Sequence, residues 1–99
     1  MNFPFLNLNR ESHKQHQKKL IEIISGIESW IIDVDGKDKE EAIAFVHKYL
    51  PQLNENTLDS MYDYVLDITG TKLYDVNKKN DLYKMFKQLC KLKSDVRFL

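Results

Sequence analysis

The sequence predicts an all-α protein, a single-domain four-helix bundle with short connections. Apolar residues recur at intervals of three and four, which is the period of amphipathic helices. Only three glycines and two prolines interrupt the 99 residues, which favours long helices over many short strands. The 42% hydrophobic content is enough for a single core. We therefore expect residues 1–99 to form one helical domain, with a short apolar N-terminal arm at 1–9.

The first helix is expected to begin after Asn9, a good N-cap, and to run through Asp33. Its apolar residues fall within an arc of about 120°. They are Leu20, Ile23, Ile24, Ile27, Trp30, Ile31 and Val34. An α+β alternative pairs 29–34 with 71–76 as two strands, because β-branched residues cluster there. The helical period continues through Trp30, so we favour the helix.

The stretch `IIDVDGKDKEEA` (31–42) contains the aspartates and glycine that a calcium loop would need, but at the wrong spacing. Counting from Asp33, Lys37 falls at a ligand position and Asp38 falls where glycine is required. We expect a turn instead. Gly36 would supply the backbone freedom to leave the first helix, and Asp38 with Glu41 has the spacing of a capping box.

Three further helices are predicted from the same period. Their ranges are 39–50, ending before Pro51, then from Asn54 or Asn56 to Gly70, and 78–93. Their expected core residues are Ala42, Phe45, Val46 and Tyr49; Leu58, Met61, Tyr62, Val65 and Leu66; and Leu82, Met85, Phe86, Leu89 and Cys90. Short connections favour antiparallel neighbours. The apolar ends `FPFLNL` and `VRFL` are expected to pack onto this bundle, and the alternative is that each is a tail that reaches a partner.

Charge is distributed unevenly, although the formal net charge is zero. Residues 28–70 carry ten acidic and three basic side chains, whereas residues 71–99 carry eight basic and three acidic ones. Four acidic residues follow one another at i, i+4 positions, which destabilises an isolated helix and suggests a role in binding. The predicted partner-binding residues are Glu55, Asp59, Asp63 and Asp67, with Asp33 and Asp35 at the end of the first helix and just after it.

Internal ion pairing is the competing explanation for these acidic residues. Lys84, Lys87 and Lys91 form a stripe on the last predicted helix, but on the side away from that helix's apolar face. Outward faces of a bundle do not meet easily, so we expect this stripe not to reach the acidic residues. Both explanations stay open from the sequence alone.

Other site chemistry finds little support in the sequence. His13 and His16 share a helical face, and with His47 and Cys90 they are the available soft ligands, without the dense spacing of a zinc site. Packing explains the histidines and Cys90 better than ligation or nucleophilic catalysis does. No phosphate-binding loop or nucleophile motif is present. We expect no metal, no cofactor and no enzymatic activity.

Nucleic-acid binding is the second class that we considered. A helix-turn-helix formed by the second and third helices would bring Asp59, Asp63 and Asp67 to the phosphates, which is the wrong sign of charge. The lysine-rich last helix is a better candidate for non-specific contact. Specific base readout is not expected, because the chain has only two arginines, Arg10 and Arg97.

These observations lead to a functional hypothesis. We expect a non-catalytic protein-binding module, an inhibitor or immunity-type protein whose acidic face covers a basic partner such as a bacterial nuclease toxin. This is an analogy of physical type, since no motif matches such a family. The alternative is a small regulator that contacts nucleic acid or self-associates through its basic C-terminal helix. A cytoplasmic monomer or weak dimer is expected, because the chain has one cysteine and no signal peptide or membrane span.

Overall fold

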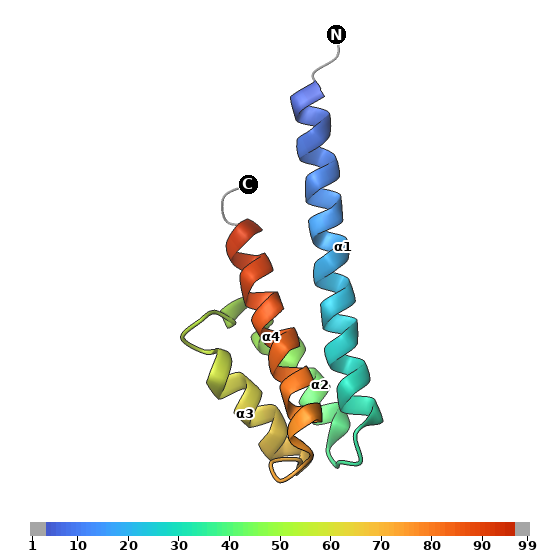
Figure 1. The fold of residues 1–99 in the computed structure, drawn as a ribbon, viewed down its shortest axis with the longest axis vertical. Helices are drawn as coiled ribbons and strands as arrows, with labels where there is room; N and C mark the ends of the chain where they lie inside the picture. The colour runs from blue at the N-terminus through green and yellow to red at the C-terminus, as the bar shows by residue number, and fades with distance from the viewer. Residues whose placement is uncertain (1–3, 97–99) are drawn as a thin grey trace.

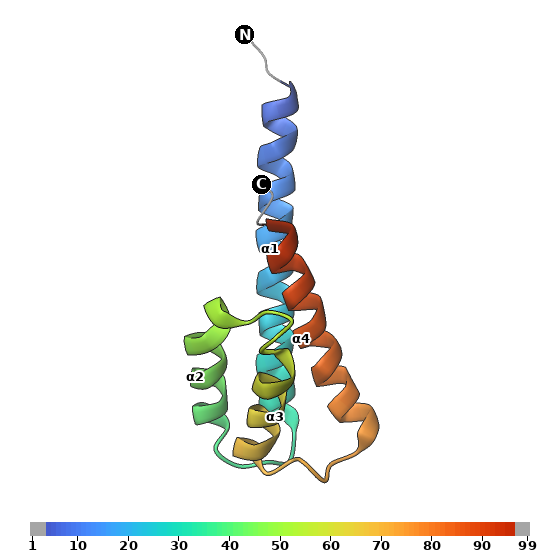
Figure 2. The ribbon, with the colours of Figure 1, turned by 90° about the vertical axis from the view of Figure 1, so that its left-hand side faces the viewer.

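The protein is a bundle of four helices that run alternately down and up along one axis (Figures 1 and 2). The computed structural model describes the backbone of residues 4–96 and the side chains of residues 14–93. The elements are α1 (Pro4–Asp33), α2 (Lys39–Tyr49), the 3-10 helix η1 (Leu50–Gln52), α3 (Leu58–Thr69) and α4 (Val76–Val96). The predicted all-α bundle is confirmed. No strand occurs between residues 4 and 96, so the alternative pairing of 29–34 with 71–76 does not form.

Helix α1 is longer than predicted, because it begins at Pro4 and not after Asn9. Proline is well suited to the first helical turn, where its missing N–H has no intrahelical partner to lose. Residues 4–9 of the predicted arm are therefore helical. Thirty residues span about 45 Å, and the N-terminal part of α1 extends past the end of α4 in Figure 1. The expected packing of `FPFLNL` and `VRFL` falls on side chains outside the described residues.

The core lies where the four helices overlap, with α1 packed mainly on α4 and α2 mainly on α3. The buried residues include Ile27, Ile31, Ala42, Val46, Leu53, Leu58, Met61, Val65, Leu66, Leu82, Phe86, Leu89 and Cys90. Most of the predicted core positions are therefore confirmed. The predicted residues Phe45, Tyr49, Tyr62 and Met85 are half-buried and pack against the edge of this cluster.

The loop between α1 and α2 is held tightly against the end of α3. The N–H of Lys37 donates to the carbonyl of Thr69 at 3.0 Å. A Cβ on Gly36 would lie only 2.7 Å from that same carbonyl oxygen. Thr69 and Thr71 are buried beside it, with their hydroxyl oxygens 2.8 Å apart. Gly36 is therefore required for a close approach, a packing role that the sequence did not indicate.

Asp38 does not cap α2 in the predicted way. It occupies the position before the helix, but its backbone is left-handed, with φ 52° and ψ 37°, and its side chain makes no capping hydrogen bond. The predicted capping box with Glu41 therefore does not form. Aspartate is one of the few residues other than glycine that adopts this conformation at modest cost.

Replacing Asp38 with glycine is expected to raise the free energy of unfolding by about 0.5–1 kcal/mol, because glycine removes the cost of the left-handed backbone. Urea denaturation measures this directly. Asp38→Asn is the control, since asparagine also accepts this backbone and removes only the charge. A loss of stability in Asp38→Gly would indicate that the carboxylate does cap α2.

Local hydrogen bonds explain where α3 and α4 begin. The Asn54 side-chain oxygen accepts from the N–H groups of Asn56 and Thr57, so a separate turn precedes α3 and the helix starts at Leu58, later than predicted. Asp75 accepts from the N–H of Asn77 at 2.7 Å, as an N-cap does, and α4 starts earlier than predicted.

Lys93 joins the C-terminal part of α4 to the connection between α2 and α3. Its Nζ donates to the carbonyls of Leu50 and Leu53 at 2.5 and 2.8 Å. These hydrogen bonds join α4 to η1 and to the residue that follows it. The contact therefore links α4 to the segment that precedes α3.

Candidate functional site

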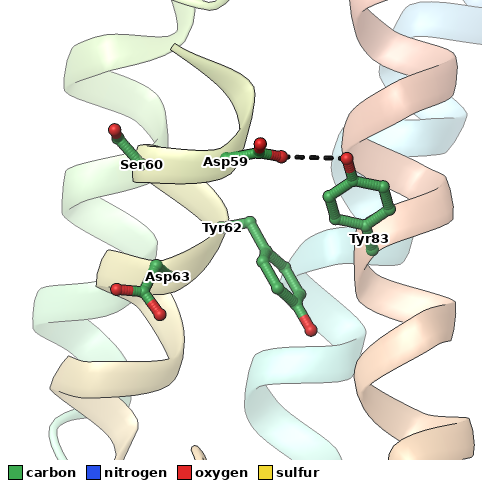
Figure 3. A pocket seen from close by; sticks show the side chains of 5 residues that line it. All are labelled: Asp59, Ser60, Tyr62, Asp63 and Tyr83. Carbon is green, nitrogen blue, oxygen red and sulfur yellow. Dashed lines mark hydrogen bonds between the residues drawn. The ribbon is translucent and has the colours of Figure 1, made fainter.

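An acidic hollow lies on the surface between α3 and α4. Its lining residues are Asp59, Ser60, Tyr62, Asp63 and Tyr83, and its volume is about 420 Å³. Figure 3 shows that α3 supplies the two carboxylates and Ser60, while Tyr83 reaches across from α4. Two of the predicted partner-binding residues, Asp59 and Asp63, therefore share one open site with two tyrosines.

A hydrogen bond and a ring contact give the hollow a defined shape. The Tyr83 hydroxyl donates to Oδ1 of Asp59 at 2.9 Å (Figure 3). The rings of Tyr62 and Tyr83 meet edge to face, with centroids 5.0 Å apart. The hydrogen bond to Asp59, with burial, raises the pKa of Tyr83 above its ordinary value. Burial and the charge of Asp63 raise the pKa of Tyr62.

Lys72 partly neutralises the acidic face at Asp63 and Asp67. Its Nζ lies 3.5 Å from a carboxylate oxygen of Asp63 and 3.5 Å from one of Asp67. The two carboxylates are 62% and 67% exposed, so these pairs are screened and contribute little to stability. The nearby charges of Asp63 and Asp67 raise the pKa of Lys72. The internal partner is thus a loop lysine, which neither explanation from the sequence had included.

Glu55 does not belong to the same helical ladder as the three aspartates. It lies in the turn before α3 and faces a second hollow, which it shares with Lys84, Lys87 and Lys91. The expectation that the lysine stripe stays away from the acidic residues was therefore wrong at this end. The stripe approaches the beginning of α3, because α4 continues past that point.

Asp33 and Asp35 lie at the opposite end of the acidic surface, in and after the last turn of α1. Both are exposed. Neither lines the acidic hollow or pairs with a charged side chain among the described residues. The structure therefore centres the candidate site on Asp59 and Asp63, with Asp67 beside them.

The remaining candidate ligands are dispersed. Nε2 of His16 donates to the carbonyl of Leu92 at 2.6 Å, and His47 lies 2.7 Å from the carboxylate of Glu28 on the surface. Cys90 is buried, and burial raises the pKa of its thiol. His13 lies outside the described side chains. Within the described part of the chain, no three acidic, histidine or cysteine side chains gather as a metal site would require.

Three residues of this region were missed in the sequence. Tyr83 and Ser60 line the hollow. Lys72 pairs with Asp63, which lines the hollow, and with Asp67 beside it. Tyr62 was assigned to the core and is only half-buried. Tyr83 carried a usable signal, because it lies at the edge of the apolar face of its helix and has a polar tip.

Comparison with protein-family models, curated proteins and solved structures gives no significant match to this chain. Within the described residues, none of the helices is long and apolar enough to cross a membrane.

Proposed function

We propose that this helical bundle is a non-catalytic module that binds a basic protein partner through the acidic hollow and Asp67. The observation that carries the proposal is the pairing of exposed carboxylates with two fixed tyrosine rings at one open site. Tyrosine is enriched at protein interfaces because it combines a large apolar ring with a polar tip. The two rings pack against the edge of the core and present an aromatic floor beside the carboxylates.

Electrostatics favours a cationic partner. Asp59, Asp63 and Asp67 carry three negative charges, and Lys72 places one positive charge beside Asp63 and Asp67. A patch of this kind attracts a basic surface over roughly a Debye length, about 8–10 Å at physiological ionic strength. It accelerates association and selects the partner more than it adds affinity.

An inhibitory role suits such a molecule. Proteins with a basic cleft, such as nucleases that bind phosphates, present the charge that complements this face. A small rigid bundle placed over the cleft would exclude the substrate without any chemistry of its own. We therefore propose an immunity-type inhibitor of a basic toxin or nuclease as the particular form of this function.

The double replacement Asp59→Asn/Asp63→Asn tests the proposal. The melting temperature should stay within about 2 °C of the wild type, because an asparagine side chain at position 59 can still accept from Tyr83 and the pair of Asp63 with Lys72 is exposed. Association with a partner recovered from native lysate at low salt should slow about tenfold. The on-rate should also depend less on salt, because two steering charges are lost.

Asp33→Asn/Asp35→Asn is the matched control, since it removes the same charge away from the hollow. We expect that variant to keep most of the on-rate. Equal slowing in both variants would show that only net charge matters. A clear fall in the melting temperature of the first variant would assign the aspartates to folding and overturn the acidic face as a binding site.

A further inference from the structure

A second hollow, the lysine groove, lies between α4 and the beginning of α3. Its lining residues are Glu55, Leu58, Lys84, Lys87, Gln88, Cys90 and Lys91, and its volume is about 740 Å³. Leu58 and Cys90 are each 6% exposed and form an apolar floor. The lysines are spaced by three and four residues, so their ammonium groups lie along one side of α4.

These three lysines have no hydrogen bond or ion pair to any residue that the structure describes. All three are exposed. Their long methylene stems add apolar area to the groove while the charged ends remain in water. The groove therefore offers an apolar surface with a positive rim, and Glu55 is the single acidic residue among those that line it.

The lysine groove and the acidic hollow are consecutive parts of the same α3–α4 surface. Tyr83 lines the hollow and Lys87 lines the groove, and these two residues are four apart on α4, so they lie one turn from each other on the same side of that helix. One face of the molecule thus carries a negative patch next to a positive one. A twofold axis passing between the two patches would place each patch on the opposite patch of a second copy. This arrangement closes after two molecules.

We propose that the lysine groove docks a second copy of this chain, whose acidic hollow supplies the complementary charge, to form a symmetric dimer. The contact between lysine groove and acidic hollow is made twice in such a dimer, and the tyrosine rings of each hollow lie against the apolar floor of the partner's groove. Nucleic acid fits this surface less well, because the phosphates would have to approach Asp59 and Asp63 beside the groove.

Dimerisation would cover the acidic hollow. The inference that a basic partner must displace the second copy rests on the proposed function, whereas the dimer itself requires no partner. The two ideas can therefore fail separately. A dimer can form in a protein that has no basic partner, and a basic partner can bind a protein that stays monomeric.

Charge-reversal substitutions on the two patches test the proposal with the protein alone. Sedimentation velocity of the wild type over about 0.01–1 mM should show a reversible monomer–dimer equilibrium, the range expected for a small interface. The equilibrium should weaken at about 0.5 M salt. Lys87→Glu alone and Asp63→Lys alone should each weaken association about tenfold or more, because like charges then face each other twice.

Mixing the two variants should restore the dimer to within about threefold of the wild-type dissociation constant, since every contact again joins opposite charges. Lys14→Glu on α1 is the matched control and should leave the equilibrium unchanged. If Asp63→Lys does not fold, as judged by its melting curve, Asp63→Asn replaces it and should weaken association in the same direction.

Three results would overturn the proposal: a wild type that stays monomeric over this concentration range, variants that leave association unchanged, or a mixture that is not restored. A monomeric wild type that binds a labelled oligonucleotide through Lys87 would assign the groove to nucleic acid instead.

Discussion

Phe86→Ala is expected to lower the free energy of unfolding by about 3–5 kcal/mol, because it removes a large aromatic side chain and leaves a cavity. Phe86 is fully buried, and it is the largest by volume of the fully buried side chains among the described residues. A domain of this size has only about 5–15 kcal/mol of stability in total, so the variant should be marginally folded. Urea denaturation monitored by circular dichroism gives the value.

Leu73→Ala is the control for Phe86→Ala. Leu73 is fully exposed, so the loss of its side chain should change stability by no more than about 0.5 kcal/mol. Equal effects at the two positions would contradict a core centred on Phe86.

Gly36→Ala is expected to lower the free energy of unfolding by about 1–3 kcal/mol, since overpacking a fixed contact forces the backbone apart. The new Cβ would meet the carbonyl oxygen of Thr69 at 2.7 Å, and that carbonyl also accepts from the N–H of Lys37. Moving the backbone at Gly36 away from the Thr69 carbonyl would strain the hydrogen bond between that carbonyl and the N–H of Lys37. Thermal and urea denaturation both measure the loss.

Gly26→Ala is a matched control for Gly36→Ala, because the same atom is added in a different setting. Its Cβ would meet Sδ of Met85 at 2.9 Å, and a flexible thioether can move aside. Alanine is also favoured over glycine within a helix by about 1 kcal/mol. We therefore expect little change or a gain at Gly26. Unchanged stability in Gly36→Ala would show that the loop is not held against α3.

The helices could be predicted from the sequence because each buried face repeats within a single element. Leu82, Phe86 and Leu89 follow the helical period, and all three are fully buried. The turns were harder to predict, because their geometry depends on what they contact. Gly36 is explained by the carbonyl of Thr69, and nothing in the neighbouring sequence indicates that contact.

The candidate site was predictable only in part, for a similar reason. The period of three and four placed Asp59 and Asp63 on one face of a helix, and the structure places them in one hollow. The helical period could not place Tyr83 beside Asp59, nor Lys72 between Asp63 and Asp67. These contacts depend on how α4 and its preceding loop return along α3. The lysine groove depends on the relative lengths of α3 and α4, which a helical wheel does not show.

The position of Cys90 gives the molecule an intrinsic reporter. It is the single thiol of the chain, it is 6% exposed, and it lies where α4 faces the beginning of α3. Because Cys90 is 6% exposed at the floor of the lysine groove, a thiol reagent should label it slowly while α3 and α4 stay packed, and faster when they separate. Comparing this rate with global unfolding would distinguish local breathing of the α3–α4 surface from loss of the whole fold. Ligands and variants could then be ranked by their effect on opening, without any attached dye.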